Sequence, residues 1–145
     1  MTKRISMLLM LAAALVVGQS AHADEPEHLV TVVTSGSNET QAMAMILTAQ
    51  YLQQGGSAQV LLCDEAGGMA LESSDAGSEV VQPADASPRQ MLGNLMEAGV
   101  EVQVCAIFLP ARAETEGDLR EGVTVARPDA IAETMAQRDT KLFTN

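Results

Sequence analysis

The stretch Gly99-Val-Glu-Val-Gln-Val-Cys-Ala-Ile-Phe-Leu-Pro110 decides the fold, because its valines alternate with polar residues before an apolar run. A period of two predicts a β-strand with one apolar and one less apolar face. Cys105 ends this strand on the less apolar face. Because a parallel strand of an α/β domain brings ligand-binding and reactive residues to its carboxyl end, Cys105 is the first candidate for chemistry. The alternative interpretation is a small buried side chain.

The chain before this strand repeats an order of strand and helix. Two apolar runs, Leu29–Val33 and Ala58–Cys63, predict buried strands, and the second also ends in a cysteine. Between them, apolar residues at helical spacing run from a cap at Ser37 or Asn38 to Gly55. Short joints between alternating strands and helices predict right-handed crossovers and a mostly parallel sheet.

A second helix precedes the Cys105 strand. Ser87-Pro88-Arg89-Gln90 supplies a capping serine, a proline at the first helical position and a glutamine that can close a capping box. The predicted core face of this helix holds Met91, Leu92, Leu95 and Met96. Residues 65–71 suggest a short helical turn, and residues 73–86 suggest an exposed connection.

The last part of the chain completes an α/β domain with about five strands. Residues 111–122 are charged and predicted to be exposed. Val123–Val125 predicts a brief strand, and Lys141–Thr144 predicts an edge strand. Between them a helix is expected to start at Pro128 and to carry Ile131, Ala132 and Met135 on one side.

The N-terminus has the pattern of a secretory signal peptide. Lys3 and Arg4 precede the apolar run Met7–Val17, and Ala21-His22-Ala23 follows as a small-x-small cleavage site. A membrane anchor is the alternative, but the run is shorter than the roughly 20 residues that cross a bilayer. We therefore predict a signal peptide over 1–23, one domain over 24–145, and a periplasmic location.

The net negative charge of the chain disfavours two classes of partner, nucleic acid and anionic membranes. The net charge is −11, and removal of residues 1–23 would take away two of the eight basic residues and none of the 19 acidic ones. Such a surface repels nucleic acid and anionic lipid at long range. We expect no nucleic-acid partner and no membrane association after cleavage.

Two cysteines, Cys63 and Cys105, offer several interpretations. In an oxidising compartment a disulfide is expected, but Cys63 could equally be a resolving or relay thiol, or a core residue. Neither lies in a CxxC motif, and His28 alone remains after cleavage, so we expect no metal site. Methionines could suggest copper, but Met45 and its counterparts fall on predicted helix core faces.

The loop Ser35-Gly36-Ser37 precedes a predicted helix and is a candidate anion-binding site. Ordinary helix capping is the commoner explanation of such a loop. The loop lacks the spacing of a P-loop or a GxGxxG fingerprint, so no nucleotide or flavin cofactor is expected.

Three segments, Gln41–Gln54, Val60–Leu71 and Gly99–Pro110, resemble the DsrE/DsrF-like family. The resemblance implies a three-layer α/β/α fold that assembles into trimers or hexamers. It also implies a persulfide on Cys105, because Val104-Cys105-Ala106 matches the sulfur-carrying pattern of relay members. An Arg-Gly pair follows the cysteine in those members, whereas Pro110 and a charged run follow it here.

Two hypotheses of function remain open. The first is a periplasmic sulfur carrier or sulfurtransferase that works through Cys105 with a thiol or sulfur-carrier protein partner, with Arg112 as a weaker candidate to hold the thiolate or an anionic donor. The second is a non-catalytic oligomeric module in which Cys63 and Cys105 are structural and a pocket binds a small ligand. The sequence does not decide whether the protein is an enzyme.

Overall fold

The computed structural model describes residues 27–145, which form a single parallel β-sheet flanked by helices. Its strands follow the order β4-β3-β2-β1-β5, and every neighbouring pair is parallel. They are β1 (His28–Val33), β2 (Ser57–Leu62), β3 (Glu101–Val104), β4 (Val123–Val125) and β5 (Thr140–Thr144). The predicted α/β fold with about five strands is confirmed. The predicted signal peptide and domain start lie outside the described residues.

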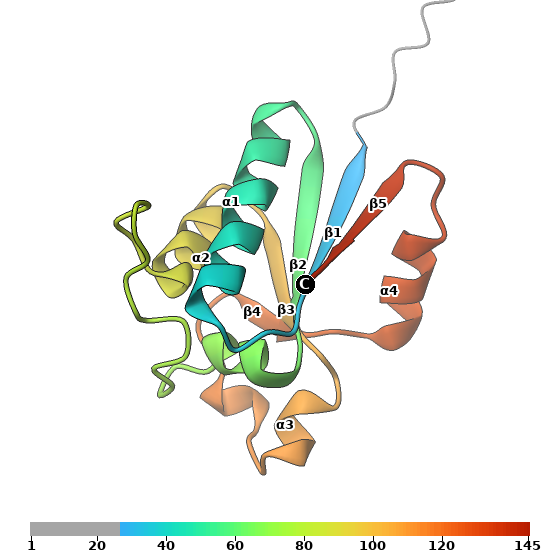
Figure 1. The fold of residues 1–145 in the computed structure, drawn as a ribbon. Coiled ribbons are helices and arrows are strands. Elements are labelled where there is room, and N and C mark those ends of the chain that lie inside the picture. The colour runs from blue at the N-terminus through green and yellow to red at the C-terminus, as the bar shows by residue number, and fades with distance from the viewer. Residues whose placement is uncertain (1–26) are drawn as a thin grey trace, which may run out of the picture.

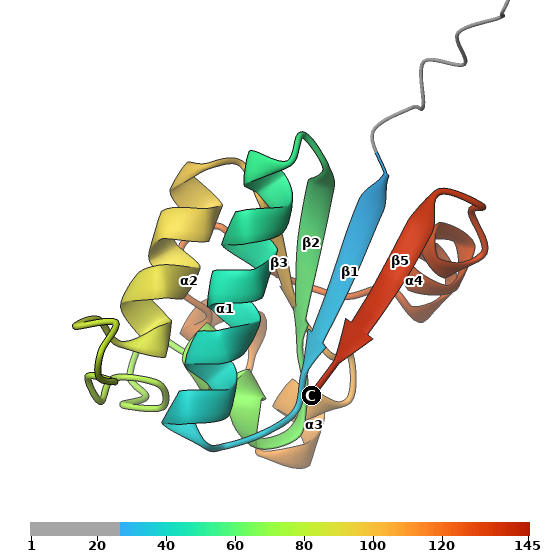
Figure 2. The same ribbon diagram turned by 45° about the horizontal axis from the view of Figure 1, so that its top comes forward.

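Helices cover the two faces of the sheet unequally (Figures 1 and 2). The helices are α1 (Asn38–Gln53), α2 (Pro88–Glu97), α3 (Phe108–Ala111) and α4 (Pro128–Met135), with short 3₁₀ helices η1 (Asp64–Ala70) and η2 (Glu116–Asp118). Helices α1 and α2 lie on one face and α4 lies on the other. The chain steps from β1 to β4 in one direction and then returns to β5 beyond β1. Right-handed crossovers therefore place the returning helix on the opposite face.

The two long helices start differently. At α2, the Ser87 hydroxyl accepts the Gln90 backbone N–H at 3.2 Å, and the Gln90 side-chain oxygen accepts the Ser87 backbone N–H at 3.0 Å. The predicted capping box is thus formed. At α1, Ser37 occupies the N-cap position but its side chain makes no capping hydrogen bond.

The core lies between the sheet and the α1–α2 layer. It is built from the fully buried strand residues Val60, Leu62, Val102 and Val104, which pack with Met45 of α1 and Leu92 of α2. The short helical turn predicted over residues 65–71 is confirmed as η1, whose Met69 is completely buried. Burial of Met45 and Met69 agrees with a packing role for these methionines.

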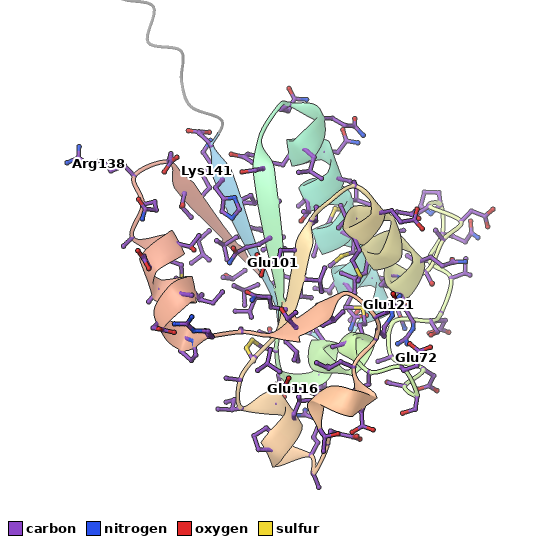
Figure 3. The ribbon with its side chains drawn as sticks, turned by 180° about the vertical axis from the view of Figure 1, so that it is seen from behind. Glu72, Glu101, Glu116, Glu121, Arg138 and Lys141 are labelled. Carbon is purple, nitrogen blue, oxygen red and sulfur yellow. A yellow bond between two sulfur atoms is a disulfide. The ribbon has the colours of Figure 1, made fainter. Side chains whose placement is uncertain are left out.

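The layer on the other face is thin. No residue of α4 is buried, and Met135, expected on its core side, is 45% exposed. Helix α4 packs on β5 and leaves Glu101 of β3 exposed on this face (Figure 3). Strand β2, predicted to be buried, is buried on both faces from Ala58 to Leu62. Among residues 27–145, no helix has the length and apolar character to span a membrane.

Candidate functional site

The sheet brings Cys63 and Cys105 together at the carboxyl ends of neighbouring strands. Leu62 of β2 pairs with Val104 of β3, and each cysteine is the next residue along its strand. Their Cα atoms lie 5.1 Å apart and the two residues form a disulfide. This separation falls within the range of about 4.4–6.8 Å that disulfides require. The sequence had left the relation of the two cysteines open, and the strand register decides it.

Backbone hydrogen bonds continue the sheet through both cysteines. The Cys63 N–H donates to the Val33 carbonyl and the Cys105 N–H donates to the Leu62 carbonyl, each at 2.9 Å. Both residues are partly exposed. By the alternation along the strands, both side chains lie on the face that α4 covers only in part, and Figure 3 views the disulfide from this side. Each cysteine therefore keeps part of its surface in contact with solvent.

The loops that follow the two cysteines pack closely on each other. The Phe108 N–H donates to the Cys105 carbonyl at 2.9 Å and its buried ring lies directly against Gly67 of η1. A Cβ at Gly67 would overlap that ring, so the contact requires glycine. Asp64, directly after Cys63, has a φ of 48°, in the left-handed region. No sequence pattern pointed to a role for Gly67 or Phe108, and none predicted the helix α3 that begins at Phe108.

Arg112 joins the same two loops. Its guanidinium lies 4.1 Å from the centroid of the Phe108 ring. It also donates to the Asp64 carbonyl at 3.2 Å and lies 3.6 Å from the Asp64 carboxylate. The side chain is 39% exposed. The structure thus places the positive charge of Arg112 beside the loops that carry the cysteines, where it is already engaged by Asp64.

The loop Ser35-Gly36-Ser37 lies at the same end of the sheet, because it follows β1, the neighbour of β2. The Ser35 hydroxyl accepts the Ser37 N–H at 3.1 Å, and the Ser35 carbonyl accepts the Gln41 side-chain amide at 2.8 Å. The Glu65 carboxylate lies directly against Gly36. An anion bound at this loop would meet that carboxylate, so the anion-binding prediction needs Glu65 to move.

Two other features bear on the chemistry of this region. Within residues 27–145, no three His, Cys, Asp or Glu side chains gather in a way that could hold a metal ion. The side chain of Ile107, two residues after Cys105, is 78% exposed.

Comparison with known proteins identifies the fold. No protein-family model and no curated protein sequence matches the chain. Among solved structures, it is similar to the YchN protein from E. coli, with a TM-score of 0.64 and 17% identity over 83% of this chain and 100% of that one. It is also similar to MTH1491 from Methanobacterium thermoautotrophicum, a protein of unknown function, with a TM-score of 0.58 and 15% identity over 82% of this chain and 99% of that one. Both have the DsrE/DsrF-like fold, which this chain shares.

Proposed function

We propose that this protein is an exported member of the DsrE/DsrF-like family that accepts and transfers sulfane sulfur as a persulfide on Cys105. The observation that carries the proposal is the partly exposed pair of Cys63 and Cys105, whose Cα atoms lie 5.1 Å apart at the carboxyl end of the sheet. The resemblance of Val104-Cys105-Ala106 to the sulfur-carrying pattern supports Cys105 as the carrier.

The chemistry starts from the reduced pair. A dithiol reductant supplies two electrons and opens the disulfide to two thiols. The Cys105 thiolate then attacks the outer sulfur of a donor persulfide, so that a new S–S bond forms on Cys105 and the donor leaves as a thiolate. Attack by an acceptor thiolate on the outer sulfur of the Cys105 persulfide passes the sulfur on and regenerates the Cys105 thiolate. While the disulfide is closed, Cys105 has no thiolate and cannot accept sulfur.

The cellular context belongs to the same proposal. The signal-peptide pattern over 1–23 supports export to the periplasm, where disulfides form and persist. The exposed Met135 and Leu142, on the thinly covered side of the sheet, support a homo-oligomer. A thiol or sulfur-carrier protein would serve as donor, acceptor or reductant.

The test is the intact mass of the reduced protein after exposure to a persulfide donor, with the modified residue located by fragmentation. The unmodified sequence and a Cys63→Ser variant should gain one sulfur on Cys105, and a reductant should remove it. A Cys105→Ser variant should gain none, because Cys105 is the proposed carrier of the sulfur. Equal uptake of sulfur by Cys105→Ser would refute the proposal.

The disulfide also favours a second candidate, a non-catalytic binding module in which the cysteine pair is structural. The two candidates differ in how the folded protein responds to reductant. A functional pair should open in the native state with a mild dithiol, because both residues are partly exposed. A structural disulfide would open only when the protein unfolds, and the reduced protein would then take up no sulfur.

A further inference from the structure

Two arginines meet in a pocket on the opposite side of the sheet from the less covered face. The pocket has a volume of about 520 Å³ and lies beside α2 and the loop before it, with Arg89, Arg120, Gln90, Asn94 and Glu97 among its lining residues. The chain carries only eight Lys and Arg residues against 19 Asp and Glu. Two of those few cations in one pocket are an unusual concentration of positive charge. We refer to this feature as the arginine pocket.

Arg89 is engaged only by neutral groups. One of its terminal nitrogens, Nη2, donates to the Leu71 carbonyl at 2.7 Å and to the Glu72 carbonyl at 3.2 Å. The other, Nη1, is buried and has no hydrogen-bond partner. Most buried polar groups have a partner, and burial of a charged donor without one is costly. The hydrogen bonds to the backbone carbonyls of residues 71 and 72 therefore satisfy only one of the two terminal nitrogens of Arg89.

Arg120 has an equally incomplete set of partners. Its Nη1 donates to the Met69 carbonyl at a long 3.4 Å. Its Nη2 lies beside Gly93 of α2, 3.8 Å from the position that a Cβ would occupy there. Within residues 27–145, ion pairs are made by Arg112, Arg127 and Lys141, and neither arginine of the pocket makes one.

The two guanidinium groups of the pocket repel each other, and neither forms an ion pair with a nearby carboxylate of the described residues. Burial, and then the positive charge of Arg120, lower the pKa of Arg89, whereas Glu72 acts in the opposite direction. Glu97 also lines the pocket without forming an ion pair with either arginine. A bound anion would relieve the repulsion between the two guanidinium groups.

We propose that the arginine pocket binds a small oxyanion between Arg89 and Arg120. The planar guanidinium offers paired N–H donors that match the oxygens of carboxylate, sulfate and phosphate groups. Arg120, whose hydrogen bond to the Met69 carbonyl is long, supplies the donors, and the positive charge of Arg89 beside it adds to the attraction. This site is separate from the cysteine pair, and it does not depend on sulfur chemistry at Cys105.

The test is a titration of the full protein with sulfate, phosphate and acetate, against chloride at equal ionic strength, followed by NMR of the Gly93 amide and the arginine side-chain N–H groups. At least one oxyanion should give saturable shifts that chloride does not, and their ranking identifies the preferred group. An Arg120→Gln variant should bind about tenfold more weakly or worse, because it loses a charged donor. Arg138→Gln, which removes an exposed arginine outside the pocket, should bind as the unmodified protein does.

A second variant protects the test against misfolding. Gly93→Glu places a carboxylate beside Arg120, and glutamate is a better helix former than glycine, so the variant should fold and exclude the anion. Gly93→Ala keeps the pocket open and should retain binding. Saturable binding that Arg120→Gln and Gly93→Glu leave unchanged would overturn the proposal, as would equal responses to the oxyanions and to chloride. A Cys63→Ser/Cys105→Ser double variant should bind the anion normally, so this result is independent of the proposed function.

Discussion

Gly67 is the residue on which the packing of the two cysteine loops depends. It is buried in η1, and its Cα lies against the ring of Phe108. Only 2% of the Phe108 residue is exposed. The ring is held in place by the core and by the Arg112 guanidinium above it. A larger side chain at this position would have to push the ring or η1 aside.

We expect Gly67→Ala to lower the free energy of unfolding by about 1–3 kcal/mol, the usual cost of overfilling a packed core. Gly93→Ala is the matched control. It lies within α2 with no closer neighbour than Arg120, so alanine should raise stability by about 0.5–1 kcal/mol through helix propensity. Urea denaturation measures both, and an undiminished midpoint for Gly67→Ala would contradict the packing argument.

At the scale of the element, side chains cap the start of α2, whereas no side chain caps the start of α1. The side chains of Ser87 and Gln90 satisfy two backbone N–H groups, whereas the Ser37 side chain satisfies none at α1. Ser87→Ala should therefore cost about 1 kcal/mol of stability. Ser37→Ala should cost only a few tenths by the same reasoning. Equal losses in chemical denaturation would show that the capping box adds nothing.

Elements that are marked by a pattern within a few residues could be predicted from the sequence. Elements that depend on contacts between distant segments could not. The capping box of α2 and the alternation in β3 lie within a few residues, so both were predicted correctly. Residues 108–111 follow the predicted strand without a local helix signal, and in the structure they form α3, with Phe108 packed on Gly67. Met135 occupies the expected apolar side of α4, but helix spacing cannot reveal how little of the sheet that helix covers.

The candidate site shows the same division. The position of Cys105 at a strand end followed from the local pattern of Val100–Cys105. Its pairing with Cys63 depends on the register of β2 against β3, which is set by the crossover and by packing between segments far apart in sequence. For the same reason, no sequence pattern brought Arg89 and Arg120 together.

At the scale of the whole molecule, the disulfide links the ends of two neighbouring strands through cysteines that are 42 residues apart in the sequence. A link across a loop of this size restricts the unfolded chain and typically contributes about 2–4 kcal/mol. We expect reduction to lower the free energy of unfolding by that amount. Denaturant unfolding of the oxidised and reduced protein measures the change. The stability of a Cys63→Ser/Cys105→Ser variant should not change on addition of the reductant. If reduction leaves the denaturation midpoint of the unmodified protein unchanged, the expectation is contradicted.

Asn145 follows β5 and reaches the loops that adjoin the cysteine pair. Its N–H donates to the Val32 carbonyl at 3.3 Å, its carbonyl accepts the Thr34 hydroxyl at 2.6 Å, and its side-chain amide donates to the Thr40 carbonyl at 3.1 Å. An affinity tag or fluorescent label attached after Asn145 would therefore emerge beside the candidate site and compete with these contacts. Because parallel strands all start at the other end of the sheet, a label placed ahead of His28 stands clear of the cysteines and is the better choice for functional assays.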